Sequence, residues 1–440
     1  MTGPSADVVR SISVQKHEPE WVTASRLKSL AAFRKCGRPS WGPSLTGLRF
    51  GDLKYYLKPI GDATRSWRDV PRDVKRAFDR MGVPQAERKL LAGVGAQFDS
   101  EMIYHRYRDA LRKLGVVFSS MEDGVREHPE IVRRYFGTLV PAHDNPFAAL
   151  NSAAWSGGSF IYVPKGVTVA APLSAFFMIN AERLGQFERT LIIADDDSSM
   201  HYIEGCTAPR YSAASLHAGV VEIFVGKRAK VRYTTMQNWS RDVYNLVTKR
   251  ARVEEEGVME WIDGNIGSRV TMKYPGCLLV GRKAHGSMLS LSLAGTGQHQ
   301  DTGARMVHGA PETTSVITSK SVAKQGGRTS FRGLVRVARG ARSARSHMRC
   351  DSLLIDPRSS ADSYPTVQSS ELTATVSHEA TVGKLGDEQL FYLRSRGLTE
   401  AEASAMIVNG FIEPIVKELP MEYAAELNRL ISMEMEKSVA

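Results

Sequence analysis

Between residues 147 and 386 the chain carries many short apolar runs that are rich in β-branched and aromatic residues. They include S-F-I-Y-V, T-L-I-I-A, G-V-V-E-I-F-V, V-M-E-W-I-D and M-L-S-L-S-L, with no convincing helical pattern between them. The runs recur about every ten residues and are separated by Gly, Asp, Asn and Ser, as successive β-strands joined by turns would be. So long an array restricts the fold to a sandwich, a barrel or a β-solenoid. Weak alternation and small polar residues at the corners favour the solenoid, although no clean repeat period can be extracted.

Helical patterns lie on both sides of this array. Apolar spacing predicts helices at 21–36, at about 73–95 and at 99–115, the last ending at Gly115. After 387 two helices are expected on either side of Gly397, with Thr399 and Glu402 forming a capping box, and a last helix over 420–437. The predicted organisation is therefore a mostly helical N-terminal region (1–146), a β core (147–386) and a C-terminal helical subdomain (387–440).

Composition indicates a soluble globular protein in a reducing compartment. Of the 440 residues, 42% are hydrophobic and 24% are charged. No apolar run approaches the roughly 18 residues that span a bilayer, and the N-terminus lacks a basic segment followed by an apolar one. The four cysteines lie far apart without a C-x-x-C pair, so we expect a cytoplasmic protein without disulfides and without a membrane anchor.

The net charge of +11 is unevenly distributed. Between Lys324 and Arg349 every charged residue is basic, which is compatible with binding a nucleic acid or another polyanion. Phe331 is the only aromatic residue in this run, and no nucleic-acid-binding motif is present. We therefore expect no nucleic-acid partner and keep a polyanion-binding solenoid as an alternative.

One stretch of this basic run also carries candidate chemistry. It reads A-R-S-A-R-S-H-M-R-C-D-S-L-L-I and holds Cys350 among arginines, with His378 and Glu379 a short distance further on. Fixed positive charges lower a thiol pKa, so Cys350 is expected to accept sulfur or to bind a soft metal, with His378 and Glu379 as further ligands. The alternative is that Cys350 is a small buried hydrophobe and His378 a hydrogen-bonded core residue.

Several common catalytic motifs are absent. The chain has no G-x-x-x-x-G-K-[ST] phosphate loop, no G-x-G-x-x-G dinucleotide fingerprint, no G-x-S-x-G and no H-E-x-x-H. His347 and Cys350 are spaced like two zinc ligands, but a structural zinc site needs four. The residues thus give no support for an enzyme that uses nucleotides, transfers hydride or hydrolyses its substrate by one of these motifs.

From about Asn151 to the C-terminus the chain closely resembles the SufB/SufD family of iron–sulfur cluster assembly proteins, and its SufB branch more than its SufD branch. The matching stretches include Y-V-P-K-G-V, G-Q-F-E-R-T-L-I-I-A-D, Y-I-E-G-C-T-A-P, K-Y-P-G-C, D-T-G-A-R-M-V-H, C-D-S-L-L-I, H-E-A-T and E-L-P-M-E. The resemblance implies a right-handed parallel β-helix flanked by helical regions. It also implies a non-enzymatic scaffold that carries a transient iron–sulfur cluster, and it leaves open whether a reduced flavin takes part in the complex.

The resemblance further implies partners and residue roles. The partners would be the ATPase SufC at the C-terminal helices, SufD or a second SufB-like chain, and a cysteine desulfurase with its sulfur carrier. Cys206 matches the cysteine at which sulfur arrives, and Cys350 the sulfur acceptor and cluster ligand, with His378 and Glu379 at the assembly site.

The chain departs from the family pattern at Met178, where an arginine of the sulfur path is common, although Asn180 is kept. The S-H-E-A-T-V-G run is also close to the SufD version, so a SufD-like structural subunit without a sulfur-acceptor role stays the alternative.

Overall fold

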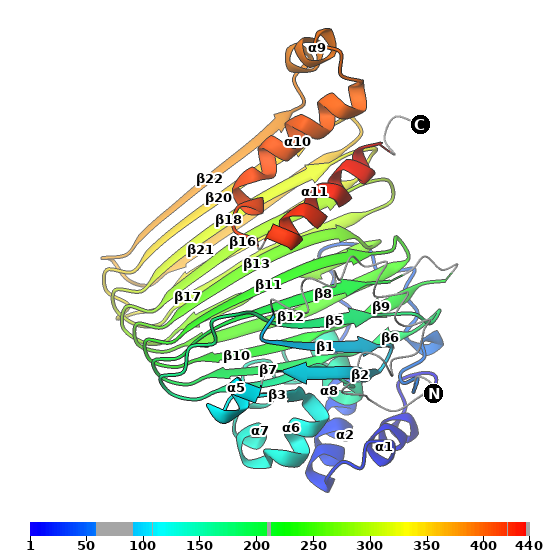
Figure 1. Cartoon of the computed structure of the whole chain (residues 1–440), viewed down its shortest axis with the longest axis vertical. Coiled ribbons are helices and arrows are strands. Elements are labelled where there is room, and N and C mark those ends of the chain that lie inside the picture. Colours follow the sequence, from blue (N-terminus) through cyan, green and yellow to red (C-terminus); the bar gives the residue numbers. More distant parts are fainter. Residues whose placement is uncertain (59–90, 108, 209–212, 420, 437–440) are drawn as a thin grey trace.

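The computed structural model describes residues 1–58, 91–107, 109–208, 213–419 and 421–436. Two long sheets face each other along one axis, with helices at both ends of the chain (Figure 1). The strands of the array pair in parallel with strands one turn away, so the chain winds as a β-solenoid. The prediction of a mainly β chain with a parallel β-helix core between helical regions is confirmed.

The first sheet has ten strands. They are, in spatial order, β2 (Glu101–Tyr107), β1 (Gly93–Phe98), β5 (Leu173–Met178), β8 (Ser199–Thr207), β11 (Lys230–Trp239), β13 (Val258–Gly267), β16 (His285–Ala294), β18 (Thr314–Ala323), β20 (Arg345–Leu354) and β22 (Thr375–Lys384).

The second sheet has twelve strands. Nine follow one path: β21 (Ser360–Ser369), β19 (Arg328–Val337), β17 (His299–His308), β14 (Val270–Lys273), β12 (Val243–Val253), β10 (Val220–Val225), β7 (Arg189–Ala194), β4 (Ser159–Val163) and β3 (Val117–Ser120). The short strands β15 (Gly276–Leu279), β6 (Gly185–Gln186) and β9 (Ser215–His217) pair beside it.

The helices of the described residues lie before β4 and after β22 in the chain. They are α1 (Ala6–Gln15), α2 (Glu20–Lys35), the 3₁₀ turn η1 (Phe50–Asp52), α5 (Asp109–Lys113), α6 (Met121–Glu127), α7 (Pro129–Tyr135), α8 (Pro146–Ala154), α9 (Asp387–Ser395), α10 (Glu400–Val416) and α11 (Met421–Glu436).

The length of one turn varies along the solenoid, which explains why the sequence shows no regular repeat. Residues in register on neighbouring strands are 28 apart for Arg232 and Glu260, 29 apart for His285 and Thr314, and 31 apart for Lys320 and Asp351. Extra residues enter at the corners, where backbones with positive φ recur, as at Arg228, Lys283 and Glu312. The strands stay aligned because the length changes fall in the turns.

The helix predicted at 99–115 is wrong. Residues 93–107 form the antiparallel hairpin of β1 and β2, and only Asp109–Lys113 is helical. Asp99 turns the hairpin with φ 53°, a left-handed conformation that Asp tolerates better than most residues. Strand β1 also pairs in parallel with β5, so pairing within the large sheet outweighs the local helical pattern. Of the predicted helix at 73–95, residues 73–90 lie outside the described part, and 93–95 belong to β1.

The other predicted helices are confirmed. Helix α2 covers the expected 21–36 segment, and α9 and α10 lie on either side of Gly397. Thr399 caps α10 and forms the capping box with Glu402. Helix α11 covers the expected last segment.

Helices cover part of each sheet's outer face. Helices α10 and α11 pack against the ten-stranded sheet through Val408, Ile412, Leu427 and Ile431, which meet Leu291 and its neighbours. The N-terminal segments cover part of the twelve-stranded sheet, where Tyr55 stacks on Phe187 with ring centroids 5.1 Å apart. Among the described residues, no helix is both long and apolar enough to cross a membrane.

The solenoid is open at its C-terminal end. Strands β21 and β22 form the last turn and are edge strands, each paired on one side only. Val367 and Val382 occupy inward-facing positions, yet they are 48% and 59% exposed because no further turn covers them. Figure 1 shows this end next to α9, far from the N-terminal helices.

Candidate functional site

The inward side chains of the ten-stranded sheet stack in rows, because strands in parallel register place equivalent positions one above another. One row is apolar and consists of Tyr202, Tyr233, Trp261, Met288, Ile317 and Met348. The next row is polar and consists of Glu204, Thr235, Asp263, Ser290, Ser319 and Cys350. Cys350 therefore terminates a polar row that begins at Glu204.

A second polar row runs beside the first and begins at the other candidate cysteine. It consists of Cys206, Gln237, Asn265, Ser292, Ser321 and Ser352. The facing sheet contributes Asn245, Thr271, Gln300 and Thr329, which are also in register. We call these three rows the polar seam. Hydrogen bonds cross it from Asn245 Nδ2 to Gln237 Oε1 (2.6 Å), between Ser292 and Thr302 (3.1 Å), and from Thr329 to Ser321 (3.2 Å).

The polar seam joins the two cysteines through the interior. Cys206 lies on β8 and Cys350 on β20, five strands away in the same sheet, which corresponds to about 24 Å at about 4.8 Å per strand. The intervening residues are buried, although a solenoid interior is normally filled by apolar side chains. Three buried atoms of the seam, Asn265 Oδ1, Ser290 Oγ and Gln300 Oε1, have no hydrogen-bond partner among the described residues. Such groups carry a cost that calls for a function or a bound species.

Charged residues surround Cys206. Its Sγ donates to Glu204 Oε1 at 3.6 Å, and Lys249 Nζ lies 3.3 Å from the same oxygen. Tyr233 also donates to Glu204 through its hydroxyl. Burial would raise the pKa of Glu204, but Lys249 and the Tyr233 hydrogen bond hold it below its usual value. Burial and the negative charge of Glu204 raise the pKa of Cys206 well above that of a free cysteine, so the resting side chain is a neutral thiol.

A second buried ion pair lies further along the polar seam. Lys273 Nζ is 2.7 Å from Asp263 Oδ1 and also donates to Gln237 Oε1 at 3.0 Å. Burial lowers the pKa of Lys273, opposed by Asp263 and aided by the charge of Lys249. The two lysines thus bring positive charge into the stretch that follows Cys206.

The expected low pKa of Cys350 is wrong. Cys350 is 4% exposed and faces inward, whereas Arg345 and Arg349 are exposed on the outer face of the same strand. Alternation along β20 therefore directs the guanidinium groups away from the sulfur. Burial raises the pKa of Cys350 to about 11, the charge of Asp351 adds to this, and a hydrogen bond with Ser363 opposes it.

His378 and Glu379 lie on β22, the strand next to Cys350. In register, His378 is opposite Met348, Glu379 opposite Arg349 and Ala380 opposite Cys350. His378 therefore shares the inner face with Cys350, two positions away, whereas Glu379 is on the outer face and exposed. The Nε2 atom of His378 is buried without a hydrogen-bond partner in the described structure. Within the described residues no three His, Cys, Asp or Glu side chains gather as a metal site.

Two other cysteines and the departure at Met178 lie outside the polar seam. Cys277 is buried in an apolar row with Ala251, Met306 and Val335, and Cys36 ends α2. Met178 is in register with Thr207, one position after the pair of Phe177 and Cys206. Neither cysteine has the polar surroundings of Cys206 or Cys350.

Sequence reasoning found the two cysteines but missed the residues between them. The sequence analysis did not single out Glu204, Gln237, Lys249, Asp263 or Lys273. Their one sequence signal is a charged or amide residue at an inward position of an apolar strand. That signal needs the register, which the variable turn length conceals.

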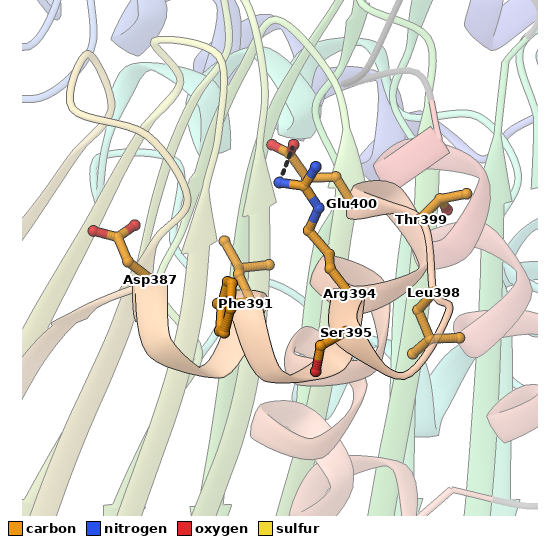
Figure 2. A pocket seen from close by; sticks show the side chains of 8 residues that line it. Asp387, Phe391, Arg394, Ser395, Leu398, Thr399 and Glu400 are labelled. Carbon is orange, nitrogen blue, oxygen red and sulfur yellow. Dashed lines mark ion pairs between the residues drawn. The ribbon is translucent and has the colours of Figure 1, made fainter.

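A shallow pocket lies on the C-terminal subdomain (Figure 2). It has a volume of about 1000 Å³ and is lined by Asp387, Leu390, Phe391, Arg394, Ser395, Leu398, Thr399 and Glu400. Arg394 Nη1 is 3.6 Å from Glu400 Oε2 across it. Phe391 is 75% exposed and the neighbouring Tyr392 56% exposed, so α9 presents an uncovered apolar surface away from the sheets.

These features define a parallel β-helix protein whose interior carries a polar path between two buried cysteines. Residues 177–411 match the family described as SUF system FeS cluster assembly, SufBD core domain, and residues 10–174 match the SufBD protein N-terminal region. The chain belongs to this SufB/SufD family.

Curated relatives carry the same family name. A protein of Staphylococcus aureus strain MRSA252, named an iron-sulfur cluster assembly SufBD family protein, is 55% identical over 437 residues, which cover 99% of this chain and 94% of the relative. Proteins of S. aureus strain USA300 and of Staphylococcus saprophyticus with that family name have the same identity and coverage. The comparisons do not distinguish the SufB branch from the SufD branch.

Proposed function

We propose that this chain is a SufB-type scaffold, which receives sulfur at Cys206 and assembles a nascent iron–sulfur cluster at Cys350 as its cargo. The observation that carries the proposal is the polar seam. It connects these two cysteines and bypasses Cys277, which is equally buried in an apolar row. A path built only for stability would be apolar, because unpaired buried polar groups destabilise a fold.

The entry step uses the residues around Cys206. Glu204, at 3.6 Å, accepts a hydrogen bond from the Cys206 thiol and orients it. The Cys206 sulfur attacks the outer sulfur of a donor persulfide, so that a new S–S bond forms while the donor's S–S bond breaks, and the thiol proton leaves with the departing donor sulfur. Lys249 and Lys273 offset the negative charge carried by sulfur in the low-dielectric interior. The hydroxyl and amide groups of the polar seam supply hydrogen bonds to a small sulfur species moving toward Cys350.

At the other end, Cys350 lies one strand from the open end of the solenoid. His378 shares its inner face, and its unpartnered Nε2 is available as a ligand. Two ligands from one chain are fewer than a cluster requires, so a partner chain, SufD or a second SufB-like copy, would complete the site across β21 and β22. A site made of thiolate and imidazole also suits a cluster that must be released.

This chain would not itself hydrolyse ATP. We assign that step to SufC, docked on the exposed surface of α9 around Phe391 and Tyr392. Phe391→Asp is expected to abolish SufC binding in isothermal titration calorimetry without changing the thermal unfolding of this chain. Val14→Asp, on a comparably exposed residue of α1, is the matched control and should bind SufC normally. Equal SufC affinity of the Phe391→Asp variant and the wild type would place the docking surface elsewhere.

The proposal is tested by anaerobic reconstitution with iron and sulfide in the presence of the partner chains. Wild type and Cys277→Ala should develop visible charge-transfer absorption, and Cys350→Ala should not. Cys206→Ala should be reconstituted by free sulfide but should lose most sulfur acceptance from a cysteine desulfurase, which radiolabelled cysteine measures. If Cys350→Ala and Cys206→Ala both behave as wild type, the chain is instead a SufD-like structural subunit.

A further inference from the structure

Three arginines lie close together on the outer face of the twelve-stranded sheet, away from the polar seam. Arg250 is on β12, Arg305 on β17 and Arg336 on β19, and Gly276 on β15 is in register between Arg250 and Arg305. A Cβ at Gly276 would lie 3.5 Å from Arg305 Cβ and 3.8 Å from Arg250 Cδ. The missing side chain at Gly276 therefore leaves room for the Arg250 side chain beside Arg305, whose guanidinium charge it affects. Arg336 is the diagonal neighbour of Arg305 on the same face.

The charges of this cluster are not balanced. Asp144 pairs with Arg250 through two contacts of 2.7 and 3.0 Å. Arg305 and Arg336 have no ion pair within the described ranges, and Asp144 is the one described carboxylate whose charge acts on Arg305. The Nε atoms of Arg250 and Arg305 are both buried without a hydrogen-bond partner. Burial and the charges of Arg250 and Arg336 lower the pKa of Arg305.

Other arginines of this face are paired with carboxylates. Arg332 contacts Asp301 at 2.9 Å, Arg328 contacts Asp362 at 2.8 Å, and the fully buried Arg189 contacts Glu222 at 2.6 Å. Arg305 and Arg336 differ from these arginines, and Arg305 is in addition partly buried and next to two other cations. A buried cation without a partner destabilises a fold unless a counter-ion neutralises it.

We propose that Arg305 and Arg336 form a binding site for a phosphate oxyanion, with Arg250 and Gly276 shaping its floor. Guanidinium groups donate hydrogen bonds in a planar fork that matches phosphate oxygens. Two guanidinium cations balance the charge of a phosphate dianion, whereas a single carboxylate would balance only one of them. The ligand is inorganic phosphate or the terminal phosphate of a phosphate monoester, which share this chemistry. The site does not depend on the proposed scaffold function.

The experiment measures thermal unfolding of the full chain at constant ionic strength, with inorganic phosphate replacing chloride. Phosphate should raise the Tm of the wild type in a saturable manner, and at ten times its Kd it increases the folding equilibrium constant about tenfold. Arg305→Met keeps the apolar stem and removes the charge, so it should lose this response. Arg328→Met, on an exposed and paired arginine of the same face, should respond as wild type does. The proposal is falsified if wild type and Arg305→Met respond to phosphate equally.

Two further arms complete the test. If Arg305→Met does not fold, Arg336→Met replaces it, because Arg336 is exposed and its charge can be removed without a buried gap; an unchanged phosphate response in that variant also overturns the site. Glycerol 3-phosphate is compared with inorganic phosphate. An equal shift in Tm supports a site open to monoesters, and a shift with inorganic phosphate alone supports a site for the free ion. No shift with either ligand rejects the proposal.

Discussion

At the scale of single residues, burial of the Cys350 thiol makes the stability of the fold depend on pH. Burial raises its pKa to about 11 from an ordinary value of 9.0. The unfolded chain releases this proton first, so the contribution to stability is complete below pH 9 and is lost as the pH rises through 11. The full loss amounts to about 3 kcal/mol.

Cys350→Ala removes the Cys350 thiol and leaves every other titrating group in place. We expect the free energy of unfolding of wild type to fall between pH 9 and 11 relative to that of Cys350→Ala, by about 3 kcal/mol at most. Urea denaturation at four or five pH values measures the difference. A constant difference across that range would mean that the Cys350 thiol is not buried in solution.

Glu204 and Lys249 give a second prediction at this scale. Both side chains are fully buried and 3.3 Å apart, so removing one leaves the other charge uncompensated. Lys249→Met should destabilise the protein by about 3–5 kcal/mol. Glu204→Gln added to Lys249→Met should recover most of that loss, since the double variant has no orphan charge. Chemical denaturation of Lys249→Met, Glu204→Gln and the double variant tests this, and additive losses in the double variant would contradict the pairing.

The residue scale also shows what the sequence could predict. Cys206, Cys350 and His378 were found because long motifs match the family around them. Which of these side chains share one face of the sheet depends on the strand register. One position separates His378, which faces inward, from Glu379, which faces outward. Likewise the arginines beside Cys350 looked like pKa-lowering charges, and strand alternation placed them on the other face.

At the scale of elements, one buried carboxylate joins the loop after α7 to the β-helix. Glu222 on β10 accepts hydrogen bonds from the backbone N–H groups of Gly137, Leu139 and Val140, at 2.8 to 3.0 Å, and pairs with Arg189 at 2.6 Å. Arg189 in turn donates to Ser152 of α8 at 2.8 Å. The pair therefore joins the loop after α7, α8 and two strands of the solenoid.

Glu222→Gln keeps the size of the side chain but leaves Arg189 as a buried cation without its counter-charge. We expect a loss of about 3–5 kcal/mol and faster proteolysis in the loop after α7, while the far turns of the solenoid stay protected. Limited proteolysis followed by mass spectrometry locates the cleavage. Glu260→Gln, on a partly exposed ion pair of β13, is the control and should change little. Uniform proteolysis of both ends would show that Glu222 stabilises the whole chain instead.

Helices and strands differ in how well their own local sequences predict them. Thr399 and Glu402 predicted the start of α10 correctly because a capping box is local chemistry. The segment 93–107 was predicted wrongly because β1 pairs with β5, more than 60 residues further along the chain, and β2 pairs with β1. Local signals therefore fixed helix ends, whereas sheet membership depended on contacts that one segment does not contain.

At the scale of the whole molecule, the open end of the solenoid is its least protected surface. Strands β21 and β22 leave backbone groups unpaired along one side, a geometry that natural sheets cover or pair because it promotes association. The same end exposes inward-facing apolar positions and lies one strand from Cys350. A second chain docked there would extend both sheets, bury Val367 and Val382, and enclose the proposed cluster site at Cys350.

The final prediction concerns this surface. If the proposed partner chain docks on this end, Val367→Lys combined with Val382→Lys should convert that dimer to monomers in sedimentation velocity at micromolar concentration, because each buried lysine would need desolvation. Cluster binding should be lost with the dimer although Cys350 and His378 are intact, since one chain supplies too few ligands. Val14→Lys, on an exposed valine of α1, should leave both properties unchanged. A monomeric double variant that still binds a cluster would place the complete ligand set within one chain, and the open end would then serve another partner.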